Sequence, residues 1–251
     1  MKYFYSLIGS LVLVVAVYLL GVQFNWYGDL EHAGSSVEDV YPRNLVDEKG
    51  KAQEEFMPGA KQILFGDTHV HTSYSTDAFL WSLPILNGEG PHPISDACDY
   101  ARFCSAIDFW VTTDHAEASS PRKWQEIKEA VRQCNAPADE EDPDMVTFLG
   151  FEWTQVGGRA NDHFGHKNVM FLDIEEGKAP KRPIGAGGLA TVGMRQSLGS
   201  NAEQFKPLAV LDFKNRHRYF NFIEFGKELS GIPYCEEGVS SALLPSDCYE
   251  S

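Results

Sequence analysis

Basic side chains are scarce in this sequence. The 251 residues carry 21 Lys and Arg against 36 Asp and Glu, so the formal net charge is −15 at pH 7. A protein that binds nucleic acid needs a basic face to neutralise phosphates, and this balance argues against that class of function. Small phosphorylated substrates are not excluded, because bound cations can reverse the sign of the local field.

Two catalytic motifs are also missing. Neither a Gly-x-Ser-x-Gly elbow nor a phosphate-binding P-loop occurs, so serine-hydrolase and nucleotide-kinase functions lack support. Internal repeats and low-complexity runs are absent as well. Hydrophobic residues make up 43% of the chain and charged residues 23%, which is typical of a globular protein with a core. The length suits one large domain or two small ones.

The five cysteines lack the close spacing that holds structural zinc. They stand at positions 98, 104, 134, 235 and 248. Outside the cytoplasm some of them can form disulfides, and Cys235 with Cys248 is the first pair to test because it closes a short C-terminal loop. The odd count leaves at least one cysteine unpaired within the chain. The alternative is that the cysteines are buried as small apolar groups.

Charge is almost absent from residues 1–28, where Lys2 is the only charged side chain. Phe4 to Val22 is almost entirely apolar, and about 20 apolar residues span a bilayer as a helix. Lys2 precedes this run and acidic residues follow it, so the positive-inside tendency predicts an extracytoplasmic, periplasmic location for the remainder. Residues 1–28 are predicted to be an uncleaved membrane anchor; a secretory signal, cleaved to release the protein, is the alternative.

The rest of the chain divides at about residue 60. Residues 29–60 are acidic and lack a periodic apolar pattern, which predicts a linker or an irregular arm. Residues 61–251 show short apolar runs alternating with helical patterns, which indicates a parallel α/β domain. The predicted strands are Ile63–His71, Ile107–Thr113, Met145–Trp153 and Asn168–Leu172; the predicted helices are Ile94–Ser105, Pro121–Cys134 and Arg216–Leu229; loops are predicted over Lys178–Arg195 and Pro233–Ser251.

The first strand carries a metal-binding pattern. Side chains alternate along a strand, so Asp67, His69 and His71 are expected on one face, where two imidazoles can grip one cation. Asp77 follows in a loop that can fold back over the same ion. His-x-His pairs also arise by chance, but this pair has an acid on its own face and further His and acid clusters downstream.

Three more clusters follow later strands. Asp114 and His115 end the second strand; the alternative is a turn-capping Asp beside a solvated His. Glu152 lies between two aromatic residues, and a buried carboxylate there needs a cation or an Arg partner. His166 precedes the fourth strand and is favoured over His163, which is expected to be a loop histidine. Because chemistry gathers at the carboxyl ends of parallel strands, we expect these groups to meet.

These side chains predict a particular chemistry. Nitrogen and oxygen ligands without thiolates fit Zn, Mn or Fe, and their number suggests a centre of two or three divalent ions. Such a centre can activate water and clamp phosphate oxygens, with a carboxylate bridging two metals. Asp114 or His115 is then the candidate for proton transfer.

Four motifs together resemble a known family. Gly-Asp-Thr-His-Val-His-Thr-Ser-Tyr-Ser-Thr-Asp-Ala around His69, Asp-Phe-Trp-Val-Thr-Thr-Asp-His-Ala-Glu around His115, Gly-Phe-Glu-Trp-Thr around Glu152 and Gly-His-Lys-Asn-Val around His166 resemble the domain-of-unknown-function family 3604 (DUF3604). That family is similar to the polymerase and histidinol phosphatase (PHP) superfamily of metal-dependent phosphoesterases. The resemblance runs from about Leu64 to the C-terminus.

The resemblance implies a fold and a set of ligands. The fold would be an incomplete, distorted β/α barrel of the PHP type, similar to a TIM barrel, preceded by one transmembrane helix. The implied metal ligands are His69, His71, Asp77, His115, Glu152 and His166. The superfamily completes its site with a further His and an Asp-x-His pair, and nothing after His166 matches them. We therefore expect a C-terminally truncated domain of residues 61–251.

Two functions follow from these patterns. The first is a membrane-anchored metal-dependent hydrolase, a phosphoesterase acting on a small phosphorylated substrate. The second is an inactive remnant that binds a metal or a partner protein. A half-closed barrel exposes apolar surface, so self-association or pairing with the missing C-terminal half is expected as well.

Overall fold

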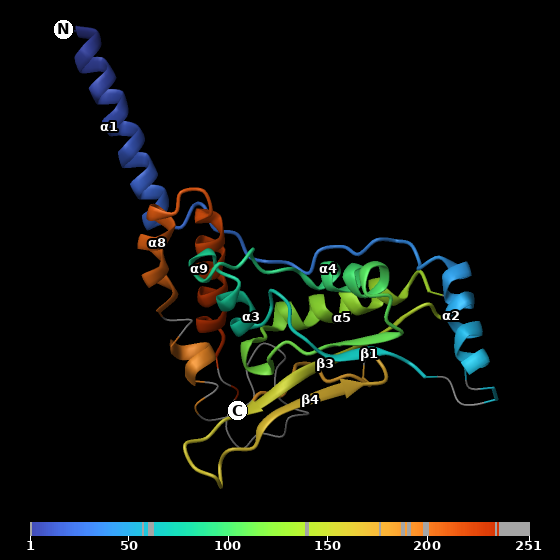
Figure 1. Cartoon of the computed structure of the whole chain (residues 1–251). Helices are drawn as coiled ribbons and strands as arrows, with labels where there is room; N and C mark the ends of the chain where they lie inside the picture. Colours follow the sequence, from blue (N-terminus) through green and yellow to red (C-terminus); the bar gives the residue numbers. More distant parts are fainter. Residues whose placement is uncertain are drawn as a thin grey trace.

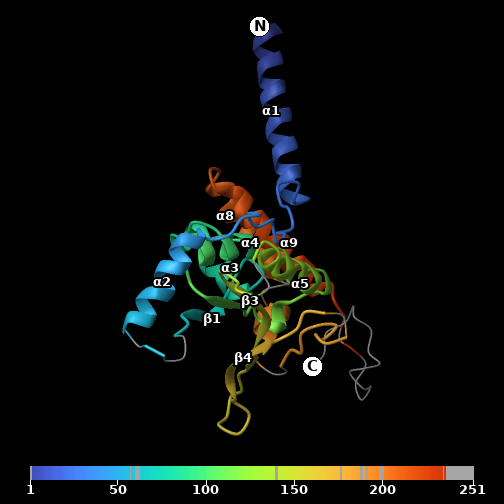
Figure 2. The same ribbon diagram turned by 90° about the vertical axis from the view of Figure 1, so that its right-hand side faces the viewer.

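The computed structural model describes residues 2–56, 58–59, 63–138, 141–175, 177–186, 189, 192–197, 201–233 and 235. The chain has a mixed α/β fold built on a single curled sheet. Helices α4 and α5 cover the face of this sheet that is turned toward the N-terminal helix, and that helix projects away from the rest of the molecule (Figures 1 and 2). One apolar helix and one half-barrel sheet therefore make up the frame of the described part of the chain.

The sheet has the order β1-β2-β3-β4. Strands β1, β2 and β3 are parallel, as the alternation of strands and helices predicts, but β4 is antiparallel to β3. The prediction of a parallel sheet is therefore wrong for β4. Residues 156–164, which join β3 to β4, contain no helix, and a parallel connection needs a crossover of a dozen or more residues. The bounds are Gly66–Val70 for β1, Phe109–Thr112 for β2, Val146–Gln155 for β3 and Gly165–Phe171 for β4.

The sheet curls enough for its two outer strands to touch. Asn168 in β4 donates from Nδ2 to the carbonyl oxygen of Thr68 in β1 at 2.7 Å, although β2 and β3 lie between them in strand order. The register between β1 and β2 also shifts between Asp67 and Val70. Within the described residues no further strand pairs with β1 or β4, so the sheet is half a barrel and its inner face is open.

Helices α4 and α5 pack on the sheet through apolar stripes. Helix α5 (Pro121–Asn135) begins where the Ser120 hydroxyl accepts from the Lys123 amide, and it buries Trp124 and Val131. Helix α4 is shorter than predicted: it spans Ile94–Asp99 and continues as a wider π turn, η2, over Tyr100–Cys104. The remaining helical segments are α2 (Arg43–Phe56), α3 (Thr76–Trp81), α8 (Lys206–Leu211), η1 (Pro84–Leu86), η3 (Ala116–Ala118), η4 (Val192–Ser197) and η5 (Ala202–Phe205).

A second apolar cluster joins the two ends of the described chain. Helix α9 (Arg216–Ser230) confirms the helix predicted over Arg216–Leu229, and it buries Phe220 and Ile223. Helix α1 (Lys2–Gln23) contributes Val22 to the same cluster. Its segment Tyr3–Gln23 has a mean hydropathy of 2.3, so α1 is long and apolar enough to span a membrane or to act as a signal sequence.

The arm that follows α1, residues 29–42, contacts the domain at regular intervals along its length. The backbone amides of Asp29, Ala33, Val37 and Tyr41 each donate to a side-chain oxygen of the domain, at 2.8–3.0 Å. Gly34 is required in this arm, because its φ is +74° and a Cβ atom there would lie 2.2 Å from the Ser95 hydroxyl oxygen. The arm therefore follows a fixed path.

The second half of the predicted linker is helical. Helix α2 carries no buried residue and has an i,i+4 ion pair between Arg43 and Asp47. The prediction of an irregular segment over residues 29–60 is thus wrong for α2. A polar helix has no apolar stripe, so hydrophobic periodicity does not reveal it. Likewise, the loop predicted over Lys178–Arg195 ends in the helical turn η4.

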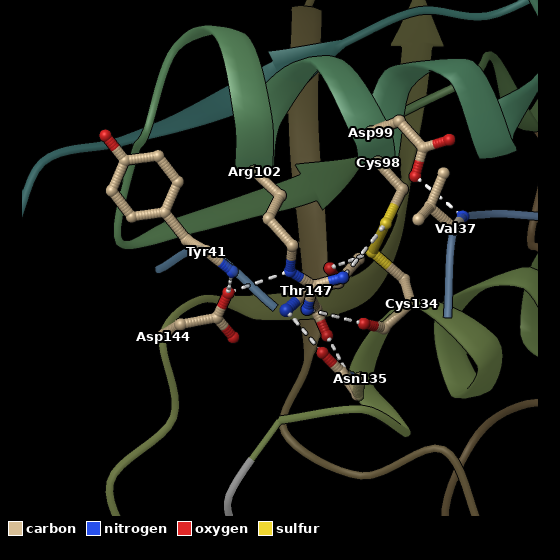
Figure 3. The surroundings of a disulfide bond; sticks show 9 residues. All are labelled: Val37, Tyr41, Cys98, Asp99, Arg102, Cys134, Asn135, Asp144 and Thr147. Atoms are coloured by element: carbon tan, nitrogen blue, oxygen red, sulfur yellow. Dashed lines mark hydrogen bonds and ion pairs between the residues drawn. A yellow bond between two sulfur atoms is a disulfide. The ribbon is translucent and has the colours of Figure 1, made fainter. Parts of the chain in front are cut away.

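A disulfide joins the two covering helices. Cys98 in α4 bonds Cys134 in α5 (Figure 3). Cys104 is a free, exposed thiol. This pairing was not predicted from sequence, because spacing alone does not define connectivity. The predicted pairing of Cys235 with Cys248 lies outside the described residues, since Cys248 is not among them.

We expect loss of this disulfide to destabilise the domain. The bond spans a sequence separation of 36 residues, and closing a loop of that length stabilises a fold by about 4 kcal/mol in the chain-entropy treatment. Thermal unfolding of a Cys98→Ala/Cys134→Ala variant should show a clear fall in Tm, while Cys104→Ala, which removes the free thiol, should unfold like the parent. A double variant as stable as the parent would contradict the prediction.

Candidate metal centre

The four strands and the segments that follow β1 and β2 bring six polar side chains together. They line one cavity of about 450 Å³, and they are His69, His71, Asp77, His115, Glu152 and His166. All six were predicted from the sequence as ligands. The curl of the sheet explains the convergence, because it turns the carboxyl ends of β1, β2 and β3 toward a common point, which β4 reaches from the other side.

Glu152 is at the centre of the cluster. Its side chain is 2% exposed, and its Oε2 lies 2.8 Å from His71 Nε2 and 3.1 Å from His69 Nε2. Its other oxygen, Oε1, contacts His166 Nδ1. Backbone pairing fixes this position, since Glu152 forms a bridge with His115 and pairs with Asn168 in β4. One carboxylate is therefore shared by several imidazoles.

Asp77 holds the opposite side of the cavity. It lies in the first turn of helix α3, and its Oδ1 lies 3.3 Å from His71 Nδ1 while its Oδ2 lies 3.3 Å from His115 Nε2. Asp77 thus returns to the predicted site from a helix rather than from the predicted loop, and it contacts His71 of the histidine pair. Burial would raise the pKa of Asp77, but the hydrogen bonds to His115 and His71 prevail and hold it far below its usual range.

The donor atoms form three overlapping groups, each able to hold one ion. Within each group the candidate ligand atoms lie within 4.8 Å of one another. Imidazole nitrogens and carboxylate oxygens in this mixture suit a divalent cation, so the residues present fit a metal site. The three groups are His69, His71 and Glu152; His71, Asp77 and His115; and His115, Glu152 and His166.

Three other residues considered from the sequence do not line the cavity. The Asp114 carboxylate is buried and accepts from the Thr72 amide at 2.6 Å and the Thr72 hydroxyl at 2.8 Å, so it holds the loop after β1. Asp67 was expected on the face of His69, yet it does not line the cavity; its Oδ1 accepts from the His69 amide at 2.9 Å, beside the register shift in β1. His163 is exposed and lies 3.3 Å from the Gly157 carbonyl, as expected of a loop histidine.

Two hydroxyl residues that the sequence did not single out orient the histidines. Thr154 Oγ1 lies 2.9 Å from His115 Nδ1 and 3.2 Å from His166 Nδ1. Ser75 Oγ lies 2.8 Å from His71 Nδ1 and accepts from the His115 amide at 3.0 Å. Thr154 stands two residues after Glu152 on the same face of β3, so strand alternation is the signal that could have identified it.

The carboxylates change the proton affinity of the site. Burial alone would lower the pKa of His71, but the hydrogen bonds to Asp77 and Glu152 raise it to about 10. Burial would raise the pKa of Glu152, whereas its contacts with His71 and His115 lower it to about 2. At neutral pH the metal-free site therefore holds an imidazolium between carboxylates.

We expect the affinity of the site for a divalent metal to rise with pH. His71 keeps its proton up to a pKa of about 10, so a metal that uses this ring must displace that proton. The affinity should then rise about tenfold per pH unit across the neutral range. The proton has the opposite effect on the metal-free fold: its contribution to stability is complete below the unfolded pKa of 6.5 and is lost as pH rises through about 10.

Calorimetric titrations with Zn²⁺ or Mn²⁺ at pH 6, 7 and 8 measure this dependence. Buffers with different ionisation enthalpies report the protons released on binding. An affinity that does not change with pH, with no proton release, would contradict the assignment of His71 as a ligand.

Comparison with known proteins supports the sequence resemblance in part. Residues 58–121 match the family model described as "Protein of unknown function (DUF3604)". The matched segment contains His69, His71, Asp77 and His115, and it ends before Glu152 and His166. No curated protein and no solved structure matches the chain.

Proposed function

We propose that this protein is a metal-dependent hydrolase that acts on phosphoesters. The observation that carries the proposal is the convergence of four histidines and two carboxylates on one cavity, with the buried Glu152 shared between groups. The similarity of this motif set to the PHP superfamily points the same way. The metal would be Zn, Mn or Fe, held by His69, His71, Asp77, His115, Glu152 and His166.

The charge of the cavity supports a role for metal ions in binding substrate. None of the described residues that line the cavity is Lys or Arg, so the lining itself offers a phosphate no permanent positive charge. Divalent ions held there would neutralise phosphate oxygens and lower the pKa of water. A phosphorylated substrate is therefore compatible with the site only when divalent metal ions occupy it.

The chain's own residues would position the reacting groups. Thr154 and Asp77 fix the two nitrogens of His115, which is 6% exposed and keeps one orientation. His115 and Asp114 are the two candidates for proton transfer. Asp114 does not line the cavity, and both of its carboxylate oxygens accept hydrogen bonds from Thr72, so any effect on the reacting groups would be indirect.

A membrane-bound, extracytoplasmic location is part of the proposal. Helix α1 packs Tyr18 and Val22 against the domain, which favours an anchor that stays attached over a cleaved signal. The disulfide between Cys98 and Cys134 favours an oxidising compartment.

A second candidate function is an inactive metal- or protein-binding module. The open side of the half-barrel favours it, because the side chains of His69 and His166 are each 55% exposed. A closed hydrolase site excludes water more completely than this one does. The unpaired edges of β1 and β4 within the described residues would also suit a partner chain or a second copy.

One experiment separates the two candidates. The purified full chain is loaded with Mn²⁺ or Zn²⁺, its metal content is measured, and the same samples are assayed with a chromogenic phosphomonoester. The test variant is His69→Ala/His71→Ala, and the matched control is His163→Ala, which removes an exposed loop histidine. Metal and turnover that disappear only in the test variant support the hydrolase. Metal without turnover supports the binding module, and metal that does not depend on His69 and His71 refutes both the hydrolase and a metal-binding module at this cavity.

A further inference from the structure

The corner between α8 and α9 exposes apolar side chains beside the base of α1. Leu211 is 82% exposed, Phe213 is 60% exposed and Val210 is 37% exposed. The corner and the end of α1 lie side by side in both views (Figures 1 and 2). We propose that this corner, residues 210–215, is a membrane-insertion loop that holds the domain against the lipid surface.

The contact between Tyr18 and Phe213 sets the depth of the corner. Their ring centroids are 6.1 Å apart. The apolar segment Tyr3–Gln23 contains 21 residues, and at 1.5 Å per residue it is about 31 Å long, close to the roughly 30 Å of a hydrocarbon core. Tyr18 lies five residues before the end of that segment, which is about 7 Å inside the boundary. A bilayer that contains α1 therefore also covers Phe213.

The side chains around the corner match the layers of a lipid surface. Phe24 and Trp26 are 65% and 61% exposed and stack on each other directly after α1, where aromatic residues face the headgroup region. Arg216 lies over the Phe213 ring at 4.0 Å, so its cation borders the apolar tip.

Positive charge gathers in this segment although the whole chain is acidic. Residues 206–218 contain four Lys or Arg and one Asp. The acid, Asp212, accepts from the Asn215 amide at 3.3 Å and so faces the start of α9. Lys206 donates to the Gln23 carbonyl at 2.8 Å, which satisfies an unpaired carbonyl at the end of α1. An anionic headgroup layer around an apolar tip fits this distribution.

The test measures lipid contact at a single labelled site in the full chain. Cys104→Ser provides the background, because Cys104 is a free thiol. An environment-sensitive fluorophore is attached through Leu211→Cys. The control is Leu172→Cys; Leu172 is 91% exposed and directly follows β4, which lies far from α1 (Figure 1). Both chains are reconstituted into vesicles of zwitterionic and anionic phospholipid that contain a shallow nitroxide lipid.

The proposal expects a difference between the two labels. The label at position 211 should show blue-shifted emission and lose intensity to the nitroxide lipid, while the label at 172 should respond only to an aqueous quencher. Equal access of the aqueous quencher to both labels would overturn the proposal. So would a blue shift without nitroxide quenching, which would place position 211 against protein rather than lipid, and so would a chain that does not float with the vesicles.

Discussion

Replacing Glu152 with Gln should abolish stable metal binding. Glu152 belongs to two of the three ligand groups and is the most buried carboxylate in the cavity. Glutamine keeps the shape of the side chain but removes its negative charge. That charge offsets the charge of a divalent cation and, in the metal-free site, stabilises the neighbouring imidazolium. Loss of a residue that only orients a ligand lowers metal affinity by about 10–100-fold, so loss of this shared ligand should exceed 100-fold. Metal content after dialysis measures the effect.

The matched control for this experiment is Glu129→Gln. Glu129 is on the surface of α5, and its side chain is 56% exposed in an ion pair with Arg132. The Glu129→Gln substitution should leave the metal content unchanged. Glu152→Gln should also bring the pKa of His71 closer to its ordinary value, because one of the two acceptors that raise it becomes neutral. If the Glu152→Gln protein retained as much metal as the parent, Glu152 would not be a metal ligand.

Replacing Arg102 with Met should destabilise the domain more than any surface substitution. Arg102 Nε donates to Asp144 Oδ2 at 2.9 Å, and the two side chains are 0% and 4% exposed. Another guanidinium nitrogen, Nη2, donates to the Cys134 carbonyl (Figure 3). Removing one partner of a buried pair leaves an uncompensated charge, at a cost of about 3–5 kcal/mol. For a chain of this size that corresponds to a fall in Tm of roughly 10 °C.

Two further variants make the test specific. Arg43→Met removes a cation whose pair with Asp142 is exposed (50% and 65%), and it should change stability by no more than about 1 kcal/mol. Arg102→Met/Asp144→Leu removes both buried charges and should recover much of the lost stability. Near-ultraviolet circular dichroism during heating in mild detergent follows the transition. Equal losses for Arg102→Met and Arg43→Met would show that burial of the pair does not matter.

The strands and the site ligands were predictable because each has a strong local signal. β2 and the first half of β3 are mostly apolar, and α5 combines a Ser cap, a first-turn Pro and an apolar stripe. His71, Asp77 and His115 come after the ends of β1 and β2, where a parallel sheet gathers side chains. His69, Glu152 and His166 lie within β1, β3 and β4. Their convergence is present in the structure, and their roles as ligands stay a prediction.

What the sequence did not reveal depends on tertiary contacts. The direction of β4 follows from the shortness of its connection to β3, and the outward position of Asp67 follows from a register shift in β1. The end of α4 is set by the π turn η2, and Ala106, whose φ is +49°, follows that turn. Thr154 contacts two histidines from separate parts of the chain, His115 after β2 and His166 in β4. Strand alternation gives the face of Thr154 but not these contacts, and short-range periodicity contains none of the other features.

The arm between α1 and the domain determines the reach of the site. A free, flexible segment as long as residues 29–42 would have a root-mean-square span of roughly 20 Å and would let the domain search the volume above the bilayer. Here every fourth backbone amide from Asp29 to Tyr41 is hydrogen-bonded to the domain, so the arm cannot act as a flexible tether. With α1 in a bilayer, the cavity keeps one height and one tilt. Local substrate concentration at that height, rather than the motion of a tether, would then set how often the site is filled.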